Sequence, residues 1–574
     1  MRIGIDFGST YSTFSAYNAM EDRVDALILM EGESASIPSV VSISKKGKAV
    51  CGKAAKNDAA RSKRNVRIFE AFKMLLNEPD QVLLKKRGYD EVYNPRKITR
   101  IYLESLLQGF LDRYNDKQFE EVYICVPEVW CKSFQTLDGR SILRDIIQNE
   151  LSVPVNHVTV VTEPEAASSY FAYHYEKATG KPFNGYLLLI DYGGGTLDIT
   201  LTEVSSDGRG FIETSCVESG GAGENHDGTL GSAGIAYMQK VVQLALIEKG
   251  LLEPGEDPDY TDPVFISAVL ELESRLKSPE GMKDIEDYFG SYGSGYAELS
   301  QVLDDYDPFI DDLEYNDSEE EVPITYQCLL RAYKETIELT LNKQISDINR
   351  RVQRIIGLNP CEPAAGVRDN FKIALVGGFG SFYLVKKQLA EIYKLDANEK
   401  IDLRTKNIHA EKRELAISLG AALLAAEKVT QKHTADYSIG LYTAGADRRF
   451  HANYAIRHHQ VVERGKPYYI LRCPEDGDTP ENRIMFGALY QNIRHFVIHF
   501  PEQGEGLMAL KPAMLQRLEQ IPQKGFWYCG FSVDESGIVR FHAMSAARSG
   551  KDKEKKEIVI PLDSFERLFE MTAL

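Results

Sequence analysis

The sequence predicts an α/β fold of two related lobes, followed by a separate β-rich domain. Over roughly the first 430 residues, strand-like and helical runs alternate, a pattern typical of largely parallel sheets covered by helices. Clear examples are the strand-like runs 122–126 and 158–162 and the helical runs 266–276 and 329–355. A strand, glycine turn and strand also occur together twice, which predicts lobe I over about 1–185 and lobe II over about 186–430.

The repeated pattern runs from Ile3 to Phe14 and again from Leu187 to Thr200. Each copy has an apolar strand that ends in an aspartate (Asp6 or Asp191), a glycine turn with a hydroxyl residue, and a second strand. Glycines let backbone N–H groups approach phosphate oxygens, and an aspartate can hold Mg²⁺ or its waters. No helix follows either turn, which excludes the Walker P-loop and the dinucleotide fingerprint. A polar hairpin explains either copy alone, but both together favour a polyphosphate site.

Length and charge limit the possible functions. The chain has 574 residues, so we expect several domains. Its 67 basic and 85 acidic residues give a net charge of −18, which disfavours a nucleic-acid partner. No apolar run approaches the ~18 residues of a membrane span and no signal-peptide pattern is present, so we expect a cytoplasmic protein with no membrane role. The eight cysteines are scattered, which argues against a zinc site and against disulfides.

An acidic stretch and a set of histidines, both outside the repeat, suggest further interpretations. Ten residues between Asp304 and Glu321 are acidic and none is basic. This favours a solvated loop within an insertion over 279–323, with an acidic docking patch as the alternative. Histidines in the C-terminal region suggest a metal site, but their spacing fits alternate strand faces and no cysteine accompanies them. These histidines are His451, His458, His459, His495 and His499.

The region after a polar linker at 431–438 predicts a β-sandwich domain over 439–574. Its short β-rich runs are separated by turn-forming residues, and Asp534 to Gly537 is typical of a hairpin turn. The predicted strands include 495–500, 526–533, 538–544 and 557–562, and we expect a short helix over 564–571.

These motifs together resemble the seventy-kilodalton heat-shock chaperone family (DnaK-like), a branch of the actin and sugar-kinase ATPase superfamily. The hairpin Phe531 to Ala543 looks like the last hairpin of that family's peptide-binding β-sandwich, which favours a chaperone over a sugar kinase. The resemblance implies a two-lobed actin-like ATPase domain of duplicated ribonuclease-H-like folds. The other similar segments are the phosphate loops 6–12 and 191–198, the crossing-helix segments 162–167 and 419–422, and the adenosine loop 376–380.

The resemblance further implies an ATPase that binds ATP or ADP with Mg²⁺, with K⁺ as a further candidate ion. Asp6 and Asp191 would hold the hydrated Mg²⁺, while Lys73 would contact a phosphate. Glu163 and Asp198 would orient the attacking water, and Thr196 would assist. For Glu163 the alternative is simple helix-start chemistry, since Thr162 can cap a helix. The implied nucleotide contacts are Gly8, Ser9, Thr10, Tyr11, Gly193, Gly194, Gly195, Thr196, Gly223, Glu224, Glu271, Arg275, Ser278, Gly377, Gly378, Phe379, Gly380 and Glu414.

On this resemblance Arg275 would stack on the adenine base, whereas the residues alone fit a helical face of alternating charge equally well. The chain also departs from the family at four points. Pro127 retains the family's switch proline, but Gln135 stands where an arginine is expected, and Ser381 replaces the arginine after the adenosine loop. The linker is polar, and the chain ends at Leu574 before a helical lid.

We therefore expect hydrolysis to survive and the coupling between nucleotide and peptide to be altered. The implied partner is an extended polypeptide bound by strand pairing and an apolar pocket, with a nucleotide-exchange factor as a further partner. The alternative is a nucleotide-gated scaffold that binds one dedicated protein partner. A small-molecule kinase is disfavoured by the sandwich signature.

Overall fold

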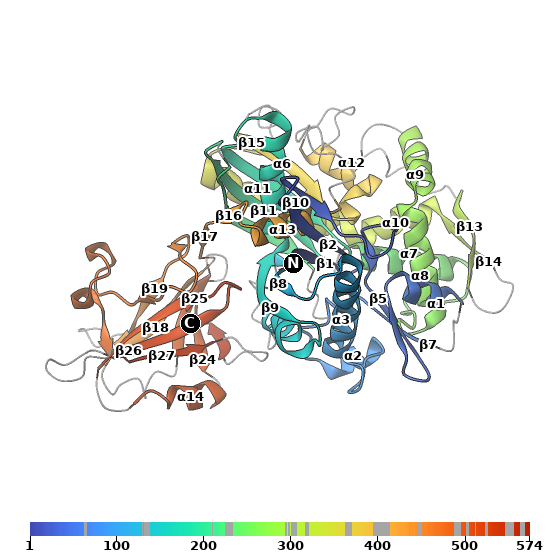
Figure 1. Ribbon diagram of the computed structural model, residues 1–574. Helices are drawn as coiled ribbons and strands as arrows, with labels where there is room; N and C mark the ends of the chain where they lie inside the picture. The colour runs from blue at the N-terminus through green and yellow to red at the C-terminus, as the bar shows by residue number, and fades with distance from the viewer. Residues whose placement is uncertain are drawn as a thin grey trace. The chain divides into compact units, whose positions relative to one another are not determined.

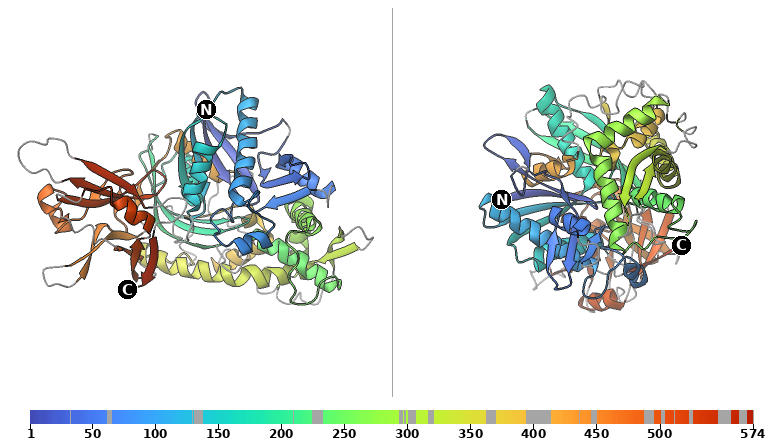
Figure 2. Two further views of the ribbon diagram at one scale, coloured as in Figure 1. Left: turned by 90° about the horizontal axis from the view of Figure 1, so that it is seen from below. Right: turned by 90° about the vertical axis from the view of Figure 1, so that its right-hand side faces the viewer.

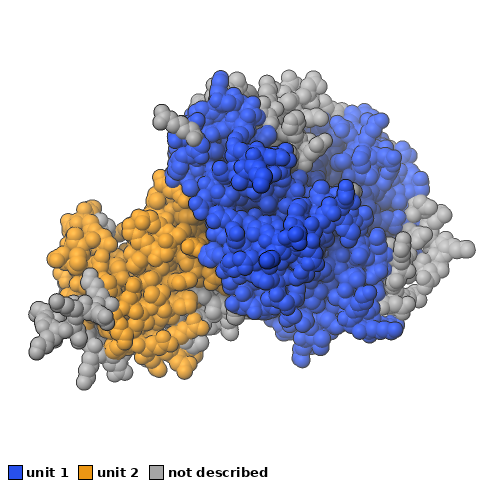
Figure 3. Space-filling view, viewed as in Figure 1, with its two compact units in different colours: residues 1–129, 146–430 blue, residues 130–145, 431–574 orange. Residues whose placement is uncertain are grey.

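The structure is a computed structural model, drawn as ribbons in Figure 1 and Figure 2. It describes the whole chain except residues 32, 62–65, 129, 131–137, 209, 224–232, 293–295, 297–298, 300–306, 316–320, 362–369, 394–413, 436, 445–449, 487–494, 501–503, 511, 523–525, 546–555, 563–568 and 574. The chain divides into two compact units, coloured in Figure 3. Unit 1 comprises residues 1–129 and 146–430, and unit 2 comprises residues 130–145 and 431–574. The inclusion of 130–145 in unit 2 was not predicted from the sequence.

The first sheet of unit 1 is built on the first glycine hairpin. Strand β1 pairs antiparallel with β2 and parallel with β8, which in turn pairs parallel with β9. The order is β3-β2-β1-β8-β9, with β4 paired to β2. The bounds are β1 Arg2–Phe7, β2 Tyr11–Asn18, β3 Arg23–Ala26, β4 Ile37–Pro38, β8 Phe119–Val126 and β9 Val155–Thr162.

The second sheet repeats this arrangement around the second glycine hairpin. Strand β10 pairs antiparallel with β11 and parallel with β15, in the order β15-β10-β11-β12-β16. Both predicted strand, turn and strand patterns are therefore confirmed, and each opens a mixed sheet in the same way. The bounds are β10 Gly185–Tyr192, β11 Leu197–Ser206, β12 Ile212–Ala222, β15 Phe371–Val376 and β16 Thr430–Gln431.

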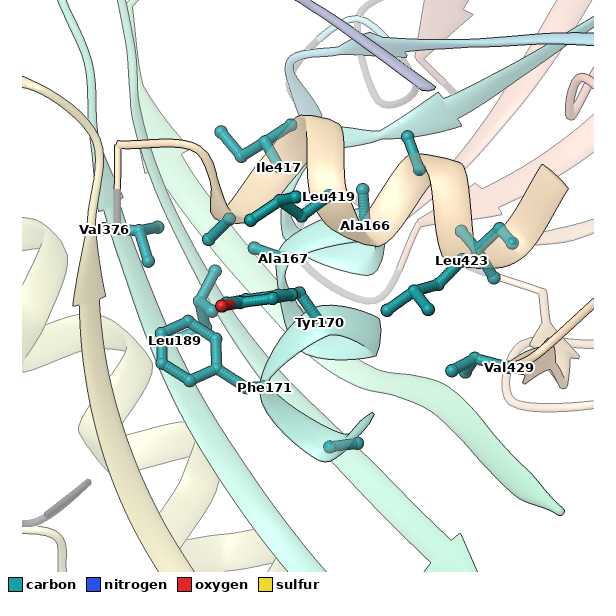
Figure 4. Packing of buried hydrophobic residues seen from close by; sticks show 14 of the residues in the cluster. Ala166, Ala167, Tyr170, Phe171, Leu189, Val376, Ile417, Leu419, Leu423 and Val429 are labelled. Atoms are coloured by element: carbon teal, nitrogen blue, oxygen red, sulfur yellow. The ribbon is translucent and has the colours of Figure 1, made fainter. Parts of the chain in front are cut away.

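Two helices, α6 (Glu163–Thr179) and α13 (Ala416–Ala425), pack against each other and share a buried core with both sheets (Figure 4). Helix α6 begins at a capping box in which Thr162 and Glu165 satisfy each other's backbone N–H groups, with proline in the first turn. Helix α13 is buried along its whole length. The two helices approach closely at Gly420, where an added Cβ would lie only 1.7 Å from the carbonyl oxygen of Ala166.

The other elements of unit 1 surround these sheets, and the long helix α11 runs unbroken in the left view of Figure 2. Part of the acidic stretch predicted to be a solvated loop is instead a strand, because β13 pairs antiparallel with β14. The helices are α1 Lys53–Arg61, α2 Gln81–Lys86, α3 Pro95–Tyr114, η1 Ile146–Glu150, α7 Gly234–Glu248, α8 Pro263–Lys277, α9 Pro279–Ser291, α10 Tyr326–Tyr333, η3 Lys334–Glu338, α11 Leu339–Ile356, η5 Phe379–Ser381 and α12 Tyr383–Ile392. The strands are β5 Val40–Ser44, β6 Ala49–Cys51, β7 Val66–Glu70, β13 Pro308–Glu314 and β14 Glu321–Thr325.

Unit 2 holds two antiparallel sheets whose apolar faces share one core. Phe496 of one sheet packs edge-on against Phe531 of the other, and Phe541 stacks beside both. The sheet orders are β19-β18-β23-β24-β28 and β21-β25-β26-β27, and β22 pairs with β25. The bounds are α5 Gly139–Asp145, β17 His433–Thr434, β18 Ser438–Ala444, β19 Phe450–Ile456, β20 Val461–Val462, β21 Tyr468–Tyr469, η8 Pro474–Asp476, η9 Pro480–Asn482, β22 Met485–Phe486, β23 His495–Phe500, β24 Gly504–Leu510, α14 Pro512–Leu518, β25 Trp527–Val533, β26 Val539–Ser545, β27 Glu557–Pro561 and β28 Phe569–Ala573.

The end of the chain differs from the sequence prediction. We expected a helix over 564–571, but Phe569–Ala573 forms strand β28 and pairs with β24, while 563–568 lie outside the described residues. The edge of β24 offers unpaired backbone groups, and that requirement overrides the helix-like local pattern. The turn at Asp534 to Gly537 is confirmed, with the Gly537 N–H donating to the Asp534 carbonyl oxygen at 2.9 Å.

A chain of polar side chains, buried at Ser532 and His542 and exposed at Glu557, crosses three strands of unit 2. The Ser532 hydroxyl lies 2.6 Å from Nε2 of His542, whose Nδ1 lies 2.8 Å from a carboxylate oxygen of Glu557. These distances match those of a nucleophile, a base and an orienting acid. A nucleophile must also reach its substrate, and Ser532 is only 1% exposed. We therefore interpret this chain as a structural link between the strands.

The described residues contain neither a candidate membrane span nor a candidate metal-binding cluster of His, Cys, Asp or Glu. No helix in the described part of the chain is long and apolar enough to span a membrane. No group of three or more His, Cys, Asp or Glu side chains among the described residues is arranged to hold a metal ion, and this includes the described histidines of unit 2.

The close approach of α6 and α13 predicts a large effect of a small substitution. Gly420→Ala should lower the free energy of unfolding by about 1–3 kcal/mol, because the added methyl group meets a backbone carbonyl that cannot rotate away. The control is Gly290→Ala in α9, where a Cβ would lie 3.6 Å from its nearest neighbour. This control should be neutral or slightly stabilising. Urea denaturation measures both, and equal effects would contradict the packing described.

Candidate functional site

The two glycine turns of unit 1 lie against each other. A Cβ on Gly194 would be 2.6 Å from the methyl carbon of Thr10, and one on Gly195 would be 2.5 Å from the hydroxyl oxygen of Ser9. Side chains larger than glycine would therefore separate the turns. The predicted phosphate loops, far apart in sequence, are brought together with their backbones exposed to each other.

Local hydrogen bonds fix the shape of each turn. In the second turn the Gly193 N–H donates to the Thr196 carbonyl oxygen at 2.9 Å, and the first turn of α7 donates from the Ile235 N–H to the Gly194 carbonyl oxygen at 2.8 Å. In the first turn the Ser39 hydroxyl donates to the Gly8 carbonyl oxygen at 2.7 Å. The turns are thus held by groups other than a ligand, so their shape is preorganised.

Buried carboxylates gather behind these turns. Asp191 and Asp198 stand directly opposite each other in the pairing of β10 with β11, and Asp6 is the last residue but one of β1. The pKa of Asp6 is raised to about 7, mainly by burial and also by the charge of Glu163, against the opposing charge of Lys73. Burial likewise holds the pKa values of Asp191 and Asp198 well above the usual 3.8, again with Glu163 adding to the effect. Such shifts are typical of functional carboxylates.

Hydrogen-bond donors for these acids are few. One oxygen of Asp191 and both oxygens of Asp198 are buried and accept no well-formed hydrogen bond from the described residues. The Thr196 hydroxyl is close enough to lower the pKa of Asp198 somewhat, but burial outweighs it. Buried oxygens without donors are costly to leave so, which indicates that a cation or water belongs beside them.

The predicted lysine is the cation nearest this acidic group. Lys73 is 2% exposed and forms a buried ion pair with Glu163 at the start of α6. Burial alone would lower the pKa of Lys73, but the charges of Glu163 and Asp6 raise it overall, so the lysine stays charged. Glu163 thus does more than begin a helix, because Thr162 and Glu165 form the capping box by themselves.

The loop predicted to meet adenosine lies next to the second turn. A Cβ on Gly377, whose φ is +81°, would be 2.4 Å from a carboxylate oxygen of Asp191. Gly223 also abuts the second turn, since its Cβ would lie 2.7 Å from the methyl carbon of Thr196. The hydroxyl of Ser381 donates to the Gly378 carbonyl oxygen at 2.7 Å and so closes the loop in place of the expected arginine.

The predicted base-stacking arginine is engaged elsewhere. Arg275 pairs with Glu280 at 3.5 Å and with Asp284 at 2.5 Å, and its guanidinium lies over the Phe309 ring. Ser278 ends α8 and caps α9, accepting from the Gly281 N–H at 2.9 Å. These contacts match the alternative interpretation of a charged helical face and leave adenine stacking a prediction.

The structure says less about the role of several other predicted nucleotide contacts. Glu271 and Glu414 are both exposed. Phe379 packs against Tyr192 and Tyr237, so it serves the core beside the loop. Glu224 and Gln135 lie outside the described residues.

The sequence reasoning missed two charged groups near the turns. Lys277 places its Nζ 3.7 Å from the ring centroid of Tyr11 and pairs with buried Glu273 at 3.2 Å, and Lys56 pairs with the same carboxylate at 3.1 Å. Glu128, which follows Pro127, is buried close enough to Asp198 to raise the pKa of that aspartate. Lys277 and Glu273 lie i, i+4 on one helix, a spacing that was available in the sequence.

The donor set fits a hydrated Mg²⁺ ion. Mg²⁺ keeps several waters and is usually bound through one or two carboxylates and substrate phosphates. Asp6 and Asp191 supply those carboxylates, and the buried oxygen of Asp191 without a donor is available to a metal-bound water.

Burial of these acids is expected to lower the free energy of unfolding of the nucleotide-free protein. Asp198→Asn should raise the free energy of unfolding of the nucleotide-free protein by roughly 1–2 kcal/mol at pH 7.5, because it removes a carboxyl group whose ionisation burial disfavours and whose oxygens have no well-formed donor among the described residues. The pKa of Asp198 is raised in the folded state, so its penalty exists above pH 3.8 and disappears below it. The gain measured by denaturation should therefore shrink as the pH falls toward 4. A gain that does not change with pH would contradict this origin.

Comparison with known proteins agrees with this geometry. The family description "Hsp70 protein" matches residues 2–240. Over 243 residues the chain is 27% identical to "Movement protein Hsp70h" of Lettuce infectious yellows virus, covering 37% of this chain and 40% of that protein. It is 26% identical over 227 residues to "Chaperone protein DnaK" of Metamycoplasma hominis, covering 39% and 33% of the two chains. It is 25% identical over 254 residues to "Heat shock cognate 70 kDa protein 3" of Dictyostelium discoideum, covering 40% and 37%.

The matches to relatives thus span about a third to two fifths of each relative's length, and the family match over residues 2–240 includes the first glycine turn, Lys73, Glu163 and the second glycine turn. Over residues 2–240 the chain is therefore similar to the Hsp70 family, with Hsp70 and DnaK relatives at low identity.

Proposed function

We propose that this protein binds ATP with Mg²⁺ and hydrolyses it slowly, and that the nucleotide state controls the binding of extended polypeptide by unit 2. The single observation that carries the proposal is the contact between the two glycine turns, Gly194 and Gly195 against Thr10 and Ser9, in front of buried acids. Backbone N–H groups of both turns can donate to phosphate oxygens from two sides. This arrangement suits a polyphosphate better than a flat or apolar ligand.

The buried charges suit phosphoryl transfer to water. This reaction depends on positioning and charge neutralisation more than on covalent chemistry. Lys73 would contact the transferred phosphoryl group, and the Mg²⁺ held at Asp6 and Asp191 would neutralise charge on the phosphates when bound. Asp198 and Glu163 would orient the attacking water through their carboxylate oxygens. The raised pKa values show that burial and mutual repulsion act on these carboxylates before any ligand binds.

The adenosine end of the site is proposed to involve the loop from Gly377 to Gly380. Lys277 connects this loop to the first turn, because its Nζ lies over the Tyr11 ring and a Cβ on Gly378 would be 3.8 Å from the same atom. Stacking of Arg275 on the base would require its ion pairs with Glu280 and Asp284 to open.

Unit 2 is proposed to be the β-sandwich that binds polypeptide. Its two sheets share one core, as a sandwich requires, and the hairpin β25–β26 carries the segment that resembles the family's last sandwich hairpin. Extended peptides bind such domains by backbone pairing at a strand edge, with side-chain pockets giving specificity. Binding of one dedicated protein partner by unit 2 is the second candidate.

Lys73 provides a test of the catalytic part. Lys73→Met should abolish measurable hydrolysis in single-turnover assays, and by leaving Glu163 buried and unpaired it should also destabilise the fold by about 3–5 kcal/mol. The matched double variant Lys73→Met/Glu163→Gln removes both charges. It should recover most of the stability and still fail to hydrolyse ATP, while retaining an ATP-induced rise in melting temperature. Hydrolysis by the double variant at the wild-type rate would contradict the assignment.

Peptide binding tests the other part. A fluorescent library of extended peptides should bind the wild-type protein in ADP, and Mg²⁺ with ATP should weaken that binding. The Lys73→Met/Glu163→Gln variant should show the ATP effect without recovery over time, since it cannot return to the ADP state. If no peptide binds while ATP is hydrolysed, the chaperone interpretation fails and the dedicated partner is favoured.

A further inference from the structure

Glu128 is a buried carboxylate that the catalytic proposal does not use. It follows Pro127 at the end of β8 in the first sheet and is 4% exposed. The Ser219 hydroxyl of β12, in the second sheet, donates to its Oε1 at 2.8 Å. This hydrogen bond therefore joins the two sheets of unit 1 within the buried interior.

The pairing of β11 with β12 places this hydrogen bond beside Asp198. Asp198 is opposite Gly221, and Thr200 is opposite Ser219, so Ser219 and Gly221 lie on the sheet face that Asp198 occupies. Gly221 presents no side chain, and a Cβ there would lie 2.2 Å from the Leu197 carbonyl oxygen. The first side chain along β12 on that face is thus Ser219, which holds Glu128 diagonally across from Asp198.

A second layer of contacts fixes Ser219. Its backbone N–H donates to Oε1 of Glu218 at 3.0 Å, and Arg351 of α11 pairs with that same carboxylate oxygen at 3.5 Å. Helix α11 therefore orients β12 at the residue that binds Glu128. Because these contacts fix the position of Ser219, its hydroxyl can hold Glu128 in one place.

We propose that Glu128 is a positioning residue for the hydrolysis proposed above: its hydrogen bond with Ser219 ties the end of β8 to β12 and so fixes Asp198 relative to Lys73 and Glu163. The inference rests on the proposed function. The residue that contacts the attacking water remains Asp198, while Glu128 and Ser219 set its location. A loose link would let the two sheets shift by a fraction of an ångström, and small misplacements of catalytic groups reduce rates strongly.

Three variants isolate the hydrogen bond. Ser219→Ala removes the donor and Glu128→Ala removes the acceptor, and each should slow single-turnover ATP hydrolysis roughly tenfold. Glu128→Gln keeps an acceptor oxygen and should recover most of the rate. The Ser219→Ala/Glu128→Ala double variant should be no slower than the slower single variant, because both changes break the same link. Ser215→Ala, the same change on the same strand, is the control and should leave the rate unchanged.

ATP affinity is measured separately by titration, with the Asp198→Asn variant as a reference. It should change less than about threefold in each Glu128 and Ser219 variant, so that the effect of the substitution appears only in the rate of hydrolysis. The melting temperature of each variant shows whether it is folded. If an alanine variant unfolds, Glu128→Gln still tests the hydrogen bond, because glutamine has nearly the same volume as glutamate. The inference is overturned if Ser219→Ala has no effect, if the two alanine effects multiply, or if Glu128→Gln is as slow as Glu128→Ala. A wild-type protein that does not hydrolyse ATP would overturn the proposed function itself.

Discussion

The mutual approach of two glycine turns in front of buried carboxylates is the constraint on which the rest of unit 1 depends. Asp6, Asp191 and Asp198 are buried near Lys73, whose charge is already paired with Glu163. This excess of acidic groups is unfavourable in the free protein, and in the proposed function a bound cation and polyphosphate would offset it. The packing of α6 on α13, the capping box at Thr162 and the close contacts of Gly4 and Gly420 hold the acids in place despite that cost.

The same constraint explains how the duplicated fold produces one site. Each sheet contributes an antiparallel glycine hairpin and a parallel neighbour, β8 or β15. Neither hairpin alone surrounds a ligand, since Thr10 and Ser9 need Gly194 and Gly195 opposite them. The hydroxyl of Thr13 in β2 donates to the hydroxyl of Ser418 in α13 at 2.8 Å, which holds that helix against the sheet of the first hairpin.

Much of this arrangement could be predicted from the sequence, because its signals are local. Strand alternation, the Asp–Gly pattern and the Thr162–Pro164 helix start each lie within a few residues, and both hairpins and the α6 start were found where predicted. Long-range effects could not be predicted. Glu128 looks like an ordinary residue until β12 is placed beside it, and Arg275 looks like a base-stacking group until Glu280 and Asp284 pair with it. The final strand β28 depends on an edge of β24 formed some sixty residues earlier in the sequence.

The proposed function requires that bound Mg²⁺ and ATP compensate the buried acids. The most direct test is calorimetric titration of ATP at pH 7 in two buffers of different ionisation enthalpy. The pKa values of Asp6, Asp191 and Asp198 are all raised in the free protein, that of Asp6 to about 7, so burial disfavours the ionised forms of these acids. Binding of Mg²⁺ with ATP should favour the ionised forms and release protons, so the observed enthalpy should depend on the buffer. Binding without proton release, or no binding at all, would contradict the account.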